Sequence, residues 1–89
     1  MKVYEKIRKM REDMGLTIQE VHDRCVSIFG RKEAMSYRTF LRIERGQVAK
    51  FTSILKICYA LGVPLSEMLK DTELEQRLVI KKKERIDEY

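Results

Sequence analysis

The stretch from Ser36 to Gly46 constrains the fold most, because it has the pattern of a short helix with both ends marked and two unlike faces. Ser36 is a good N-cap, since its hydroxyl can accept a hydrogen bond from a backbone N–H of the first turn. Gly46 is a good C-terminal stop, since glycine adopts the left-handed conformation at little cost. At about 100° per residue, Phe40 and Ile43 share one narrow apolar stripe. The pattern predicts a helix anchored in a core along that stripe.

The opposite side of the same predicted helix carries three arginines, at positions Arg38, Arg42 and Arg45. Like charges on one short face repel each other, and guanidinium groups match phosphate oxygens and the edge of guanine. An anionic partner is therefore one interpretation. A solvated face on which arginine serves solubility is the other, because charged helix faces are common. The helical wheel alone leaves both open.

Composition fits one small, charge-rich domain, and its net charge suits a nucleic-acid partner better than a membrane surface, because the basic face lacks flanking Trp or Phe anchors. The chain has 89 residues and a formal net charge of +5, and an excess of basic residues suits binding to a polyanion. No apolar run approaches the roughly 18 residues that span a bilayer, and no signal peptide is recognisable at the start. We expect a cytoplasmic protein without a membrane partner, associated with the nucleoid when bound to DNA.

The chemistry-bearing residues predict no enzyme, no metal and no cofactor. Cys25 and Cys58 lie among apolar residues and are expected to be buried free thiols. Neither forms part of a cluster with the spacing of zinc ligands. The only histidine, His22, is expected on a helix surface in contact with solvent. No nucleophile–base pair and no phosphate-binding loop is recognisable.

Apolar periodicity and stop signals predict four further helices. The first carries its stripe on Val3, Ile7, Met10 and Met14, and Gly15 ends it. The second opens with a capping box from Thr17 to Glu20 and runs on to Phe29, followed by an exposed turn at 30–33. A fourth helix begins after a cap at Thr52 or Ser53 and ends at Gly62, and a fifth spans Leu65 to Leu69.

The composition changes at Lys70, so residues 1–69 are expected to form the domain and residues 70–89 a charged tail. A second capping box is predicted at Thr72–Glu75. The run Leu78–Ile80 suits either a helix or a short strand. The remainder suits a frayed helix, a dimer contact or disorder.

These segments together resemble the XRE family of phage-repressor and Cro-type helix-turn-helix regulators. The resemblance rests on Ile7–Arg11, Gly15–Thr17, Arg42–Gly46 and Ile57–Leu69, in that order. It implies an all-α, five-helix, lambda-repressor-like bundle in which the 36–46 helix enters the major groove. It also implies a structural pair between Arg11 and Glu44. The implied DNA-binding residues are Gln19, Tyr37, Arg38, Thr39, Arg42, Arg45 and Lys50.

Two departures from the family pattern affect that assignment. The connection between the paired helices is roughly eight residues longer than is usual in the family. Ile18 stands where many members carry a glutamine that reaches phosphate, so Gln19 is the candidate substitute.

The function expected from the resemblance is a dimeric repressor that binds a double-stranded DNA operator, with Leu65–Ile80 as the pairing segment. The alternative is a protein-interaction module or an antitoxin, whose tail would bind a protein partner.

Overall fold

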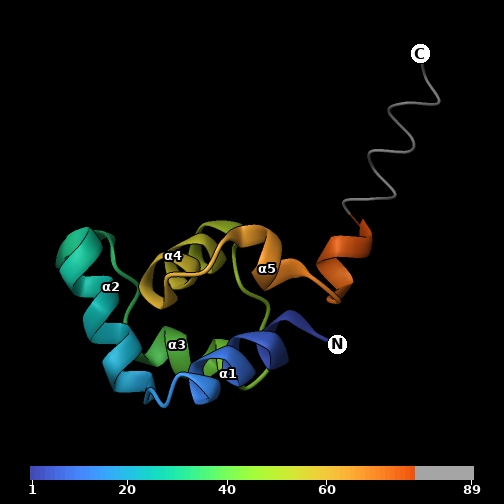
Figure 1. Ribbon diagram of the computed structural model, residues 1–89. Helices are drawn as coiled ribbons and strands as arrows, with labels where there is room; N and C mark the ends of the chain where they lie inside the picture. Colours follow the sequence, from blue (N-terminus) through green and yellow to red (C-terminus); the bar gives the residue numbers. More distant parts are fainter. Residues whose placement is uncertain (78–89) are drawn as a thin grey trace.

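The computed structural model describes residues 1–77, and all regular structure within that range is helical (Figure 1). The helices are α1 (Val3–Asp13), α2 (Ile18–Glu33), α3 (Tyr37–Glu44), α4 (Phe51–Leu61) and α5 (Leu65–Leu69). A further helical turn covers 73–77. The expectation of an all-α domain is confirmed for this part of the chain. The predictions made for Leu78–Ile80 and for the rest of the tail lie outside the described residues.

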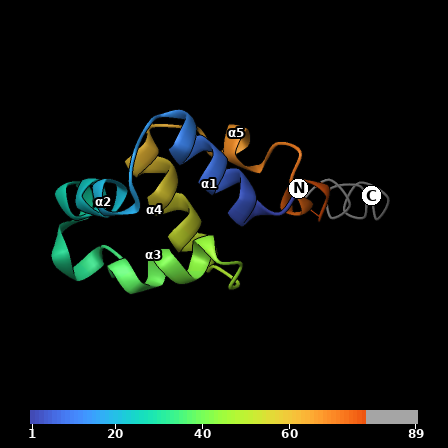
Figure 2. The ribbon, with the colours of Figure 1, turned by 90° about the horizontal axis from the view of Figure 1, so that it is seen from below.

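Helix α4 is the centre of the domain and packs against α1, α2 and α5, whereas α3 packs against α1 and α2. Figure 2 shows α3 along one edge of the molecule, with α4 between α3 and α1. Ile54, Ile57 and Cys58 of α4 are buried, and each of the other helices adds at least one buried side chain. Only one side of α3 packs against this core, and its other side lies at the surface.

Local end signals explain most helix boundaries. The Thr17 capping box is confirmed, because the Thr17 hydroxyl accepts from the N–H of Glu20 and the Glu20 carboxylate accepts from the N–H of Thr17, both at 3.1 Å. Gly62 ends α4 in the left-handed conformation, with φ 69°. Pro64 caps α5, in agreement with the predicted break.

The predicted break of the second helix after Phe29 is confirmed at Gly30, which is exposed, but residues 31–33 form a further helical turn and not an irregular one. Two helical pieces meet at a kink at Gly30, where φ is 80° and ψ is 161°, and the second piece ends at Glu33. That combination is open almost only to glycine. The long connection expected between the paired helices is therefore mostly helix, bent once, and only Ala34–Ser36 separate α2 from α3.

Two other helix ends also differ from expectation. Helix α4 begins at Phe51 after an N-cap at Lys50, so neither Thr52 nor Ser53 caps it. Met14 is the C-cap of α1 and is 43% exposed, so it does not share the buried stripe of Ile7.

The predicted capping box at Thr72–Glu75 also takes another form. The Thr72 hydroxyl donates to the carbonyl of Leu69 at 2.6 Å, and the Glu75 carboxylate accepts from the N–H of Asp71 instead of that of Thr72. Thr72 is buried and acts as a tie to the end of α5.

The amino terminus is fastened to the segment that follows α5. The N-terminal ammonium donates to the carbonyl of Asp71 at 2.9 Å, and the N–H of Glu73 donates to the carbonyl of Met1 at 3.2 Å. The Glu73 carboxylate accepts from the N–H of Val3 at 3.2 Å. Residues about 70 positions apart in sequence thus close the domain.

Candidate nucleic-acid interface

Helix α3 has one buried and one exposed face, as its sequence predicts. Phe40, Ile43 and Glu44 are at most 3% exposed, whereas Arg38, Arg42 and Arg45 lie on the opposite side and reach solvent. The Ser36 hydroxyl accepts from the N–H of Thr39 at 3.2 Å, which confirms the N-cap. The three guanidinium groups therefore extend from the side of α3 that faces solvent.

A buried ion pair fixes the carboxyl end of α3. Arg11 of α1 binds both carboxylate oxygens of Glu44, with Nε–Oε2 at 2.7 Å and Nη2–Oε1 at 2.9 Å. Its Nη1 donates to the carbonyl of Leu16 at 2.7 Å. The hydrogen bonds with Glu44 raise the pKa of Arg11, although burial opposes the shift. The structure thus confirms the pair that the family resemblance implies.

Arg8 makes a second contact with Glu44, and its side chain is more exposed than that of Arg11. Its Nε lies 3.8 Å from Glu44 Oε1, and its guanidinium also donates to the Glu44 carbonyl. Because both arginines come from α1, the end of α3 is held in one orientation relative to α1. The backbone position from which an exposed side chain near this end of α3 extends is therefore fixed relative to α1.

His22 supports the amino-terminal part of α3, which sequence reasoning missed. Its ring lies edge-on to Tyr37 at 6.1 Å and to Phe40 at 6.2 Å between ring centroids. Its side chain is only 20% exposed, so the prediction of a solvated surface histidine is wrong. Apolar spacing within α2 could not find this contact, because the aromatic rings come from another helix. Tyr37 itself remains 39% exposed.

Three of the predicted site residues come together in one surface hollow of about 270 Å³. Thr39, Arg42 and Lys50 line it, together with Gln47 and Ser53. The Thr39 hydroxyl is hydrogen-bonded to Ser36 Oγ at 3.0 Å.

The amino end of α4 lies beside this hollow, since Lys50 and Ser53 line it. This position was not predicted from the sequence. Lys50 caps α4 without a side-chain hydrogen bond, and the first N–H groups of a helix have no partner within the helix. Such an end favours an anion. The poor capping residue at position 50 is the signal that could have indicated it.

The other predicted residues lie apart from this hollow. Arg38 and Arg45 are exposed elsewhere along α3, and Tyr37 begins that helix. Gln19 is exposed on the first turn of α2, where its amide donates to the Asp23 carboxylate at 2.9 Å. Gln19 would have to give up that bond to reach a phosphate.

Within residues 1–77, no group of His, Cys, Asp and Glu side chains is arranged to hold a metal ion. Over the same range, no helix is long and apolar enough to cross a membrane. Comparison of the chain with protein families, curated proteins and solved structures finds no match.

Proposed function

We propose that this chain is a helix-turn-helix regulator that binds an operator in double-stranded DNA as a homodimer. In this proposal α2 and α3 form the paired helices, and α3 enters the major groove. The observation that carries the proposal is the solvent-facing row of Arg38, Arg42 and Arg45 on a helix whose other face is locked by Phe40, Ile43 and Glu44. A rigid basic helix face at the surface suits direct reading of base edges.

The roles of the residues follow from their positions. Tyr37, Arg38 and Arg42 would face base edges, because the amino-terminal part of the second helix approaches the bases in such modules. Arg45 and Lys50, with the amino end of α4, would bind phosphate and set the register. The proposed mode of action is steric repression in the cytoplasm, without enzymatic activity, cofactor or membrane partner.

Selection from a random duplex library at two salt concentrations tests the proposal directly. An enriched palindrome is expected, and its half-site spacing reports the geometry of the dimer. Binding without any motif that disappears at the higher salt would contradict sequence-specific regulation. That result would leave the arginine face as a phosphate contact only.

Single substitutions then separate base reading from phosphate binding. Arg38→Ala and Arg42→Ala should each cost about 1 to 3 kcal/mol on the selected site and relax its sequence preference. Arg45→Ala should weaken binding to all sequences alike and lower the salt slope by about one. Lys9→Ala removes the same charge from the exposed side of α1 and serves as the matched control. Equal losses on selected and random DNA for all three arginines would refute the division of roles.

A protein-interaction module, such as an antitoxin, is the second candidate. The end of α2 favours it, since Ile28 is 51% exposed near the bend at Gly30. Recovery of a protein partner together with an absence of salt-dependent DNA binding would favour this candidate over the first.

A further inference from the structure

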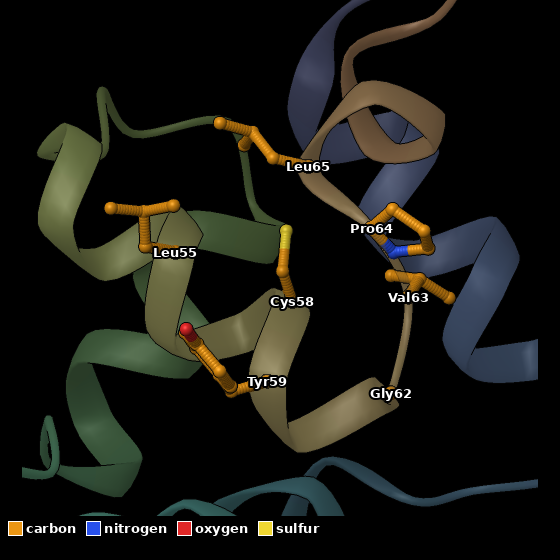
Figure 3. Close-up of a pocket in the computed structure, with 7 residues that line it drawn as sticks. All are labelled: Leu55, Cys58, Tyr59, Gly62, Val63, Pro64 and Leu65. Atoms are coloured by element: carbon orange, nitrogen blue, oxygen red, sulfur yellow. The ribbon is translucent and has the colours of Figure 1, made fainter.

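An apolar groove of about 400 Å³ lies at the corner between α4 and α5 (Figure 3). Leu55, Cys58 and Tyr59 form its α4 wall, and Val63 and Leu65 form the opposite side. Tyr59 is 66% exposed, although it leans on Phe29 with 5.7 Å between ring centroids. The groove is thus open and apolar, and α2 packs against its Tyr59 through Phe29.

The proposed contact with DNA does not use this groove. All of its lining residues belong to α4, α5 and the link between them, and the arginines belong to α3 and its carboxyl end. An exposed apolar surface of this kind is a common place for a protein contact.

The sequence offers a matching apolar segment. Leu78, Val79 and Ile80 form a run of three aliphatic residues that lies outside the described residues, directly after Arg77 and before three lysines. Aliphatic side chains are the chemistry that an apolar groove binds best.

The position of Arg77 indicates which copy supplies the segment. Arg77 lines a different hollow, beside Lys2, Tyr4 and Val48. Both ribbon views place the turn 73–77 beyond α5, away from the α4–α5 corner (Figures 1 and 2). Leu78 must lie about 3.8 Å from Arg77 between Cα atoms, and three extended residues reach only about 10 Å. The three residues after Arg77 therefore start from that hollow and not from the groove of their own chain.

We propose that the groove between α4 and α5 receives Leu78–Ile80 of a second copy of this chain, and that the second copy's groove receives the same segment in return. The exchange is a two-fold symmetric contact, so one kind of surface serves both subunits. This proposal rests on the homodimer of the proposed function, and it identifies the surfaces through which the two copies pair.

The native Cys58 makes the contact testable by a disulfide. In Figure 3 its side chain points toward Leu65. In the chain of 89 residues, Val79→Cys should form a disulfide with Cys58 of the other copy under diamide, which accepts the two electrons and two protons released. Because burial raises the pKa of the Cys58 thiol, the reaction is run at alkaline pH.

A covalent dimer on a non-reducing gel is the expected result, with a digest peptide that joins Cys58 to the cysteine introduced at position 79. The dimer should be lost in V79C/C58A. Thr52→Cys, at the exposed start of the same helix, is the control for random collision. A covalent dimer that survives C58A, equal cross-linking by T52C, or the same disulfide formed within one chain would each overturn the proposal.

A second set of variants measures the contact without cysteine chemistry. L78D/I80D should raise the dissociation constant of the dimer by about tenfold or more in sedimentation equilibrium, since two apolar side chains lose their burial. Ile86→Asp, further along the same tail, is the matched control and should leave it unchanged. A double variant that dimerises like the native chain would overturn the proposal.

These results remain distinguishable from those on DNA. A cross-linked dimer that enriches no DNA motif would leave the groove contact standing and refute the regulator. If DNA selection enriches a palindrome but V79C forms no disulfide with Cys58, the groove contact is refuted and the regulator still stands.

Discussion

Replacing Arg11 by methionine should destabilise the domain more than any change on the arginine face. The guanidinium makes two bonds to Glu44 and one to the carbonyl of Leu16. Without it, a carboxylate in a residue that is 3% exposed keeps only the Arg8 contact, at 3.8 Å. Breaking a buried ion pair in this way costs about 3 to 5 kcal/mol.

The cost should fall toward the lower end of that range because Arg8 remains. It is still a large part of the total, since a domain of this size is stable by about 5 to 10 kcal/mol. Urea denaturation followed by helical circular dichroism measures the change as a lower midpoint with an unchanged m-value. Arg8→Met is the matched control and should cost about 1 kcal/mol, because the Arg8 side chain is 45% exposed.

The double variant R11M/E44M separates the charge from the packing. If the loss in R11M comes from an uncompensated carboxylate, then removing Glu44 as well should restore much of the stability. An R11M cost below about 1 kcal/mol, or a double variant no more stable than R11M, would refute the reasoning.

Three smaller effects are expected from features of the backbone and the core. Gly30→Ala should cost about 1 to 3 kcal/mol in urea denaturation, because nothing lies within 4 Å of the added Cβ and only the backbone conformation at φ 80° opposes it; an unchanged midpoint would contradict the bend. Thr17→Ala should cost about 1 kcal/mol through loss of the capping box, and Thr52→Ala, at a helix start without capping by that residue, should be nearly neutral; equal losses would contradict the assignment of the caps. Burial raises the pKa of Cys25 to about 11, above its ordinary value of 9.0. The buried thiol therefore favours folding below pH 9, and this contribution is lost as pH rises from 9 to 11; a Cys25→Ala variant that shows the same decline in stability over this range would contradict it.

Helix ends and helix faces were predicted well from the sequence, because they depend on residues within about one helical turn of each other. Thr17, Ser36 and Gly62 mark helix ends through bonds or conformations that involve only their neighbours. The two faces of α3 were predictable for the same reason, since one helical period sorts Phe40 and Ile43 from the arginines.

What the sequence could not predict depends on contacts between helices. His22 is covered by rings from α3, so its own helix gave no sign of burial. Gly30 was interpreted as the start of a turn, because a glycine before charged residues usually is one. Helical bonding resumes beyond it instead. The Arg11–Glu44 pair joins residues 33 positions apart, and only the family resemblance implied it.

The fastening of Met1 to Asp71 and Glu73 has a consequence for how the chain folds as it is made. Synthesis adds about 5 to 20 residues each second, from the amino end onward. Glu73 is added about 60 residues after Asp13, the last residue of α1, which is about 3 to 12 seconds later at these rates. During that interval the apolar side of α1 has no covering from α5, so this end of the nascent domain is exposed to chaperones and proteases until the last described turn emerges.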